Sequence, residues 1–225
     1  AEGLALGAAL CEGGAARNLL AMASSHFCAA ERQFRTPLSY GAVRTPTAQW
    51  TATAAGCCLL QPQGEGVGIA AATFGRVQDY QVKDINNMGA AMAPAAASTL
   101  LHYFKDTGTE PQEFDCIYTG DLGQVGSQLL RELLAAEGLL IKNHVDCGCI
   151  LFDANEQSVK SGGSGPGCCA AVLCGHILPR LRRGSQKRVL FTATGALMSQ
   201  TTFLQKETIP AVAHLVELRA PEKEK

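Results

Sequence analysis

The stretch from Ser161 to Leu178, SGGSGPGCCAAVLCGHIL, limits the possible folds of this chain more than any other. Residues 161–167 are nearly all glycine, serine and proline, which predicts a loop that approaches a neighbouring backbone closely. Residues 168–178 are small or apolar and predict a helix, which we expect to end near Arg183. A helix without a polar face must be covered on all sides. We therefore expect it at the centre of a layered domain, with the free N–H groups of its first turn facing whatever lies at its N-terminus.

The composition is that of a globular protein with a substantial core. The chain has 225 residues, of which 47% are hydrophobic. Its net charge of −1 gives no electrostatic reason to expect nucleic-acid binding. The sequence contains neither a signal peptide nor an apolar run of about 18 residues, which a membrane-spanning helix needs. It begins without Met in the apolar periodic stretch AEGLALGAALCEGG, so we expect a piece of a longer protein that starts inside a helix.

The ten cysteines predict packed thiols rather than a metal site. None of them forms a C-x-x-C pair, so a zinc site has little support. Most lie in apolar stretches, where a thiol behaves as a small hydrophobic group. We expect a reducing compartment, and a disulfide framework is the less favoured alternative.

Strand-like and helix-like stretches alternate along the chain, which is typical of a layered α/β fold. The expected strands are 18–25, 47–61 with an interruption near Gly56, 67–77, a strand that follows a short lead at 110 and ends at 119–120, 144–153, 187–199 and 209–219. The expected helices are 3–12, 88–108, 127–138 and the central one, and we also expect one helical turn in the loop 25–46. In the second helix we place Pro94 near the first turn, where proline is tolerated, and Gly108 just after the end.

An internal repeat predicts two pseudo-symmetric halves, the first of them truncated. AARNLLAMASS near the N-terminus matches SQKRVLFTATG near the C-terminus, and each follows a helix rich in small residues and precedes a further strand. We expect residues 1–77 to be the remainder of the N-terminal half and residues 78–219 to form the C-terminal half. Residues 220–225, with the sequence APEKEK, are expected to be a disordered tail.

Several short motifs occur in an order that is characteristic of one family. They are SSHFCAAERQFR, PTAQWTATAAG, NNMGAAMAPAA, TGDLG, DCG, GGSGPGC and TATGALMS. Together they resemble the stage V sporulation protein AD family of spore-forming bacteria, and the resemblance covers nearly the whole chain. It implies a thiolase-like α-β-α-β-α architecture. It also implies that the position of the nucleophilic cysteine of thiolase-like enzymes falls just before Ala1.

Condensing enzymes of the thiolase fold need a thiolate, a histidine and an asparagine or second histidine that polarise the acyl carbonyl. The place where the histidine is common reads Thr119-Gly120-Asp121, and the glycine-rich loop reads Gly162-Gly163-Ser164-Gly165 without an asparagine. We therefore expect no acyl condensation. An acyltransferase with altered active-site residues stays as the alternative, and a purely structural dimer that docks on a membrane channel is the third.

The resemblance also implies a ligand and partners. The family is understood to bind dipicolinic acid as its calcium chelate, with no other cofactor, and to act in its uptake into the developing spore with membrane proteins. It implies a homodimer at the cytoplasmic side of the forespore or spore inner membrane, attached peripherally. The candidate ligand-binding residues are His26, Asp121, Gly162, Gly163, Ser164 and Gly165, with Asp121 also facing calcium, which prefers oxygen ligands.

Other polar residues have both a functional and a structural interpretation. His26 either lines the pocket or caps a loop, and Asn86-Asn87 is either a turn or an N-cap. Cys168 is a weak candidate for a reactive thiol, because a helix N-terminus lowers a thiol pKa, although packing explains it as well. The loop 25–46 contains three arginines, Arg32, Arg35 and Arg44. They attract an anionic ligand, bridge a dimer or are solvated surface charges. Three histidines are expected to pack or to lie on the surface: His102, His176 and His214.

Overall fold

The computed structural model describes residues 1–34 and 44–221, of which residues 31–34 are described by their backbone alone. The helices are α1 (Glu2–Glu12), α2 (Phe27–Phe34), α3 (Met88–Thr107), η2 (Pro111–Glu113), α4 (Gly123–Ala136), α5 (Cys147–Leu151), α6 (Pro166–Val172), the π-helical η3 (Leu173–Ile177), α7 (Leu178–Arg182) and α8 (Gln200–Leu204). The strands are β1 (Leu19–Ser25), β2 (Trp50–Thr51), β3 (Ala54–Leu60), β4 (Gly68–Thr73), β5 (Cys116–Thr119), β6 (His144–Asp146), β7 (Gly163–Ser164), β8 (Arg188–Ala196) and β9 (Ala211–Arg219).

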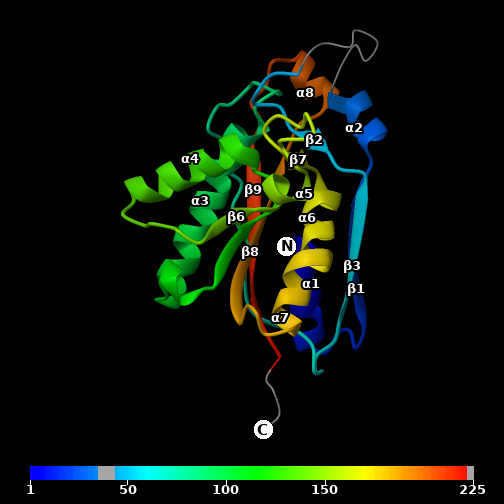
Figure 1. Cartoon of the computed structure of the whole chain (residues 1–225), viewed down its shortest axis with the longest axis vertical. Coiled ribbons are helices and arrows are strands. Elements are labelled where there is room, and N and C mark those ends of the chain that lie inside the picture. The colour runs from blue at the N-terminus through cyan, green and yellow to red at the C-terminus, as the bar shows by residue number, and fades with distance from the viewer. Residues whose placement is uncertain (35–43, 222–225) are drawn as a thin grey trace.

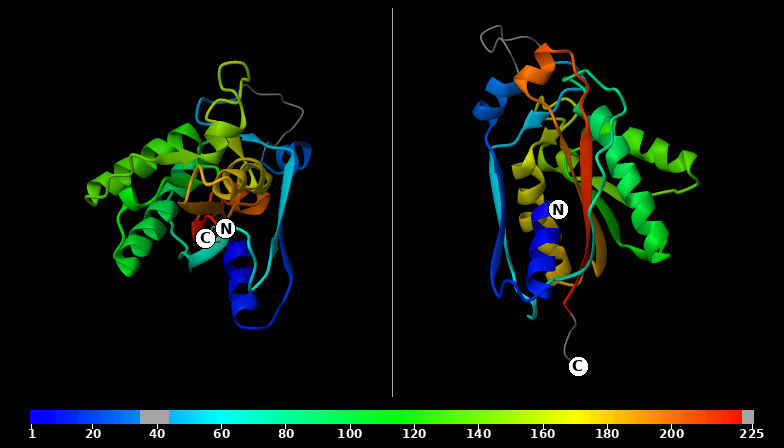
Figure 2. Two further views of the ribbon diagram at one scale, coloured as in Figure 1. Left: turned by 60° about the horizontal axis from the view of Figure 1, so that its bottom comes forward. Right: turned by 180° about the vertical axis from the view of Figure 1, so that it is seen from behind.

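Two sheets face each other across the central helix (Figures 1 and 2). The larger sheet has the strand order β4-β9-β8-β5-β6, in which β6, β5 and β8 are parallel and β9 is antiparallel to both β8 and β4. The smaller sheet is the antiparallel pair β1–β3. A short parallel pair, β2–β7, connects the chain before β3 to the glycine-rich loop.

The described residues form four layers, and the larger sheet is buried on both faces. Helices α3 and α4 cover its outer face, where Ile117 and Leu190 belong to the first core. Helices α1, α6 and α7 lie on its inner face, where Tyr118 and Phe191 belong to the second core. Alternate residues of β5 and β8 thus point into different cores, which explains why 116–118 and 189–191 are apolar on both faces of the sheet.

The central helix runs through α6, η3 and α7, and small residues let it approach β3 closely. A β-carbon on Gly56 would lie 2.6 Å from the carbonyl oxygen of Ala170, and one on Gly167 would overlap the carbonyl oxygen of Ala54. The helix is therefore buried between the two sheets along α6, as predicted. The prediction of complete burial is wrong at Gly175, which is exposed.

Most of the expected elements are present, and three of them differ in an informative way. The strand expected over 144–153 ends at Asp146, because the Asp146 side chain accepts a hydrogen bond from Cys149 N and starts α5. Pro94, which was expected near the first turn of α3, lies inside the helix in its second turn. Strand 18–25 is confirmed, but only one face of β1 is covered, since the exposed fractions of Leu20 and Met22 are 61% and 73%.

The repeat is visible as the same succession of elements at two places. In each, a small-residue helix is followed by a strand and then by its antiparallel partner: α1, β1 and β3, and then α6–α7, β8 and β9. Strand β4, from the expected N-terminal half, joins the larger sheet beside β9. The boundary at residue 78 stays a prediction, as does the disordered tail, of which residues 222–225 lie outside the described residues.

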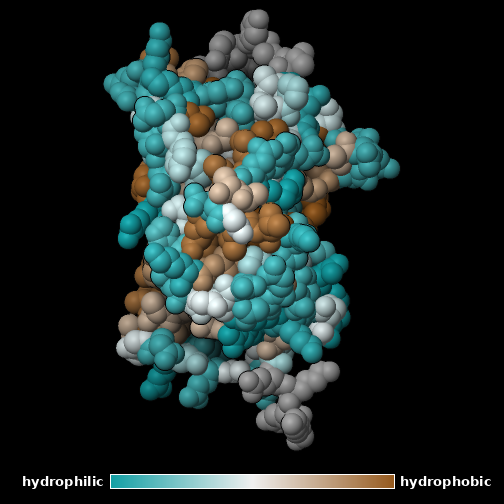
Figure 3. Space-filling model, turned by 90° about the vertical axis from the view of Figure 1, so that its left-hand side faces the viewer, coloured by the Kyte–Doolittle hydropathy of each residue, from teal (hydrophilic) through white to brown (hydrophobic). Residues whose placement is uncertain are grey.

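The surface differs between the two sides of the molecule. The face on the α3 and α4 side is mainly hydrophilic, with hydrophobic areas in its middle (Figure 3). On the β1–β3 side, the large apolar side chains of Leu20, Met22 and Leu59 are exposed. None of the described helices is long and apolar enough to cross a membrane.

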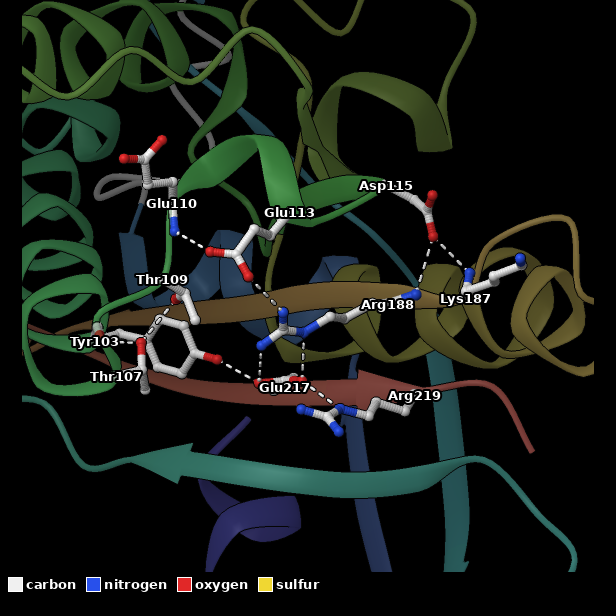
Figure 4. Close-up of polar contacts among 10 residues, drawn as sticks. All are labelled: Tyr103, Thr107, Thr109, Glu110, Glu113, Asp115, Lys187, Arg188, Glu217 and Arg219. Carbon is white, nitrogen blue, oxygen red and sulfur yellow. Dashed lines mark hydrogen bonds and ion pairs between the residues drawn. The ribbon is translucent and has the colours of Figure 1, made fainter. Parts of the chain in front are cut away.

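A buried ion-pair network ties α3 to the larger sheet (Figure 4). The Glu217 carboxylate of β9, with 3% of its side chain exposed, accepts hydrogen bonds from Arg188 Nε of β8 at 2.7 Å and from Arg219 Nε at 2.6 Å. The Tyr103 hydroxyl of α3 donates a further hydrogen bond to Glu217. Although burial by itself raises the pKa of Glu217, the hydrogen bonds from Arg188 and Tyr103 outweigh it and lower the pKa from 4.5 to about 2.

We expect Arg188→Ala to destabilise the fold by about 3 kcal/mol, because it leaves the Glu217 carboxylate buried with fewer partners. Arg219→Ala is the control and should cost less than about 1 kcal/mol, since 55% of the Arg219 side chain is exposed. Because the folded pKa of Glu217 lies below its ordinary value, the stabilisation is present above pH about 4.5 and is lost as the pH falls towards 2. Urea unfolding of both variants at several pH values measures this, and equal losses would contradict it.

Candidate functional site

The carboxylate of Asp146 fixes the loop that leads from β5 to α4. Its Oδ1 accepts hydrogen bonds from Thr119 Oγ1 at 2.6 Å and Leu122 N at 2.9 Å, and its Oδ2 accepts them from Gly123 N at 2.9 Å and Cys149 N at 3.2 Å. Asp146 thus satisfies N–H groups at the starts of both α4 and α5. This explains why α4 begins at Gly123, four residues before the apolar periodicity starts.

Asp121 lies in the loop that Asp146 holds, at the N-terminus of the central helix. Its Oδ2 accepts a hydrogen bond from Gly165 N at 2.8 Å, and its Oδ1 accepts one from Thr194 Oγ1 at 3.2 Å. Both donors are neutral groups. Burial raises the pKa of Asp121 to about 6, and the nearby carboxylate of Asp146 adds to this effect. A carboxyl group whose pKa is raised this far towards neutral pH marks a candidate functional position.

The glycine-rich loop contributes its second half to the site. Ser164 and Gly165 line the cavity described below, whereas Gly162 and Gly163 are buried behind it. Gly162 has a φ of +120°, and a β-carbon there would lie 2.8 Å from the carbonyl oxygen of Gly148. The N–H groups of this turn are already used, since Gly165 N donates to Asp121 and Gly167 N donates to Ser25 Oγ at 3.0 Å. The loop therefore positions Asp121 at the helix N-terminus.

A cavity of about 590 Å³ opens between the two sheets beside this helix N-terminus. Apolar groups, among them Met22, Met88 and Met92, form much of its wall. The polar side chains that line it are Glu2, Ser25, Gln49, Thr51, Asn86, Asp121, Ser164, Cys169, Thr194 and His214. The described part of the lining contains no lysine and no arginine.

The structure separates the candidate residues into two groups. Asp121, Ser164 and Gly165 are brought together in the cavity wall. His26 is exposed where α2 begins and does not line the cavity. Arg44 has its guanidinium carbon 3.7 Å from the centre of the Trp50 ring, which favours a structural role. The side chain of Arg32, and all of Arg35, lie outside the described residues.

His214, Gln49 and Asn86 line the cavity in places that the sequence did not reveal. His214 Nδ1 accepts a hydrogen bond from Gly75 N at 3.3 Å, which leaves the proton on Nε2. Burial lowers the pKa of His214, so the ring is neutral near pH 7. Gln49 Nε2 donates to the carbonyl oxygens of Asp121 at 2.6 Å and Gly163 at 3.0 Å and so joins the two loops.

Of the other histidines expected to pack or to lie on the surface, His102 is exposed and His176 half-buried, in agreement with the prediction.

Asn86 and Asn87 have different roles. Asn87 is the N-cap of α3, as expected, because its side chain accepts a hydrogen bond from Ala90 N. Asn86, one residue before the N-cap, lines the cavity. The two residues differ only in their position relative to the first turn of α3.

The thiols beside the helix N-terminus are poor nucleophiles. Burial, together with the charge of Asp121, raises the pKa of Cys169 to about 11 and raises the pKa of Cys168 further. The hypothesis that the helix N-terminus lowers the pKa of Cys168 is therefore wrong, because desolvation and Asp121 dominate. Among the described residues, no group of three or more His, Cys, Asp or Glu side chains is placed to hold a metal ion.

The chain is similar to known proteins both in sequence and in fold. Residues 1–219 match the family described as Stage V sporulation protein AD (SpoVAD). The chain is 43% identical over 214 residues to the stage V sporulation protein AD of Bacillus subtilis (strain 168), a match that covers 95% of this chain and 63% of that protein. The chain thus spans less than two thirds of the length of this relative.

Solved structures with the same fold include condensing enzymes. The 3-oxoacyl-[acyl-carrier-protein] synthase III of Aquifex aeolicus VF5 matches 97% of this chain and 63% of its own, with a TM-score of 0.55 and 13% identity. The corresponding synthase III of Pseudomonas aeruginosa PAO1 matches 98% of this chain and 64% of its own, with a TM-score of 0.55 and 14% identity. At this identity the likeness establishes the thiolase-like fold alone.

Because residues 1–219 match the family and the Bacillus subtilis relative is 43% identical, the chain belongs to the stage V sporulation protein AD family, which supports a role in sporulation.

Proposed function

We propose that this protein binds the calcium chelate of dipicolinic acid in the cavity beside Asp121. The single observation that carries the proposal is a buried carboxylate in a cavity whose described lining contains no lysine or arginine. Such a carboxylate repels a free dianion but attracts a cation. A dianion that arrives with its own calcium ion resolves this conflict.

The charge and shape of the chelate suit the cavity. One calcium ion and one dipicolinate dianion make a neutral, planar and aromatic complex. The apolar wall, rich in methionine, suits the face of the ring. A volume of about 590 Å³ is typical of cavities that take small molecules.

In the site, Asp121 suits the calcium ion of the chelate, and His214 suits a dipicolinate carboxylate. Calcium takes six to eight ligands, more than one dipicolinate supplies, so an Asp121 oxygen adds one of the ligands that the chelate still needs. His214 lines the cavity, and its proton is on Nε2 because Nδ1 accepts a hydrogen bond from Gly75 N. This N–H is a donor for a ligand carboxylate, and the Ser164 and Thr51 hydroxyls add further donors in the wall.

The proposed function of the whole protein is the uptake of dipicolinate into the developing spore. It includes membrane-protein partners, a homodimer and a peripheral position on the cytoplasmic side of the forespore or spore inner membrane. Family membership supports the sporulation part of this proposal. The alternative is an acyltransferase, which the fold of the condensing enzymes favours. Asp121, at the place where a histidine is common, and a glycine-rich loop without an asparagine weigh against it, and a stable acyl-cysteine adduct after incubation with acyl-CoA would support it.

Asp121→Asn should weaken the binding of calcium dipicolinate about tenfold or more, because it removes a charge that faces calcium. Isothermal titration with the chelate, with dipicolinate in calcium-free buffer and with calcium alone measures this. The unmodified protein should bind the chelate more tightly than it binds dipicolinate alone or calcium alone. Asp106→Asn, at an exposed position of α3, is the matched control and should bind normally. Equal affinities of the two variants would contradict the proposal.

The same variants test the pH dependence of binding. Because the pKa of Asp121 is about 6, its carboxylate forms as the pH rises through 6, and the affinity for the chelate should rise with it. Asp121→Asn should lose this rise. The folded pKa of Asp121 lies above its ordinary value, so its ionisation reduces the stability of the ligand-free protein as the pH increases. In thermal unfolding at pH 7, the Asp121→Asn variant should therefore be at least as stable as the unmodified protein.

His214→Ala should weaken binding of the chelate several-fold, because it removes the Nε2–H donor. His102→Ala, at an exposed position of α3, serves as the control. Competition titrations at pH 7.5 give both affinities under conditions where His214 is neutral. A His214→Ala variant that binds as tightly as the His102→Ala variant would remove His214 from the site.

A further inference from the structure

Strand β3 and the central helix run side by side, and their contacts advance in regular steps. Ala54 meets Gly167, and Gly56 meets Ala170, so closely that neither glycine has room for a β-carbon. Steps of two residues along a strand and of three or four along a helix cover similar distances and keep one face in contact. The next pair on this line is Cys58 and Cys174.

These two cysteines lie in direct contact. Cys58 Sγ is 3.9 Å from Cys174 Sγ, and Cys174 also donates a hydrogen bond to the carbonyl oxygen of Cys57 at a distance of 3.7 Å. Both thiols are free and half-buried. The residues are 116 positions apart in the sequence, and Cys174 lies in the π-helical turn η3. Close backbones and facing side chains are what a disulfide requires.

We propose that Cys58 and Cys174 are a redox pair that a peroxide converts to a disulfide. The Cys174 thiolate attacks one oxygen of hydrogen peroxide, the O–O bond breaks and hydroxide leaves, which gives a sulfenic acid. The sulfur of Cys58 then attacks the sulfur of Cys174, the S–O bond breaks, and the hydroxyl group leaves as water with the proton of Cys58. In total, two thiols lose two hydrogen atoms and one peroxide is reduced to two water molecules.

The surroundings of the pair assign the order of these steps and their effect. Burial and the neighbouring Cys174 raise the pKa of Cys58 to about 12, so Cys58 stays protonated and acts second. Both cysteines line a small cavity of about 80 Å³, which shares Met22, Ala23 and Cys169 with the wall of the large cavity. A disulfide here joins β3 to the central helix next to the ligand cavity and does not depend on which ligand that cavity takes.

The test is peptide mapping of the native protein after treatment with hydrogen peroxide, with and without dithiothreitol. We expect a peptide that links Cys58 to Cys174 and disappears on reduction. Thermal unfolding should shift upward by about 5 °C or more on oxidation, because the link closes a long loop. Cys58→Ser and Cys174→Ser should each lose the linked peptide and the shift. Cys57→Ser, at the adjacent exposed position of β3, is the matched control and should keep both.

Three results would overturn this proposal. One is a link from Cys174 to Cys57 or Cys169 in place of Cys58. Another is oxidation of Cys174 to a sulfinic acid without any link. The third is an equal upward shift in the Cys58→Ser variant. If one serine variant does not fold, peptide mapping of the other and of the unmodified protein still decides between these outcomes.

Discussion

The close contact between the central helix and β3 is the constraint on which the rest of the described structure depends. Gly56 and Gly167 have no room for a β-carbon, so the helix backbone lies directly against the strand. This contact fixes the helix between the two sheets and directs its N-terminus towards the loop after β5. It therefore sets where Asp121 meets Gly165 N. The same contact brings Cys58 opposite Cys174 further along the helix.

The two acidic residues of this region illustrate a division between structure and function. Asp146 accepts four hydrogen bonds and organises the starts of two helices, so its burial serves the fold. Asp121 accepts two hydrogen bonds from neutral donors and lines a cavity, so its charge is compensated less. A protein rarely keeps such a group for stability alone, because ionising it opposes folding. A ligand that carries a cation accounts for it.

The sequence predicted the layers better than the site. The small, apolar residues of the central helix and the apolar strands on both sides predict burial directly, and the motifs predict the family. The role of Asp146 was missed because a helix N-cap within the stretch 144–153 looks like a continuation of the strand. His214 was assigned to packing because its orientation depends on the register of β9 against β8, which pairs it with Ala193. Asp121, Ser164 and Gly165 were found because they lie in recognisable motifs.

The most direct test of this account is a crystal structure of the protein with calcium dipicolinate bound. We expect one chelate in the cavity between the two sheets, with calcium coordinated by an Asp121 oxygen and a dipicolinate carboxylate within hydrogen-bond distance of His214 Nε2. A chelate bound elsewhere, or one in the cavity with its calcium turned away from Asp121, would contradict it.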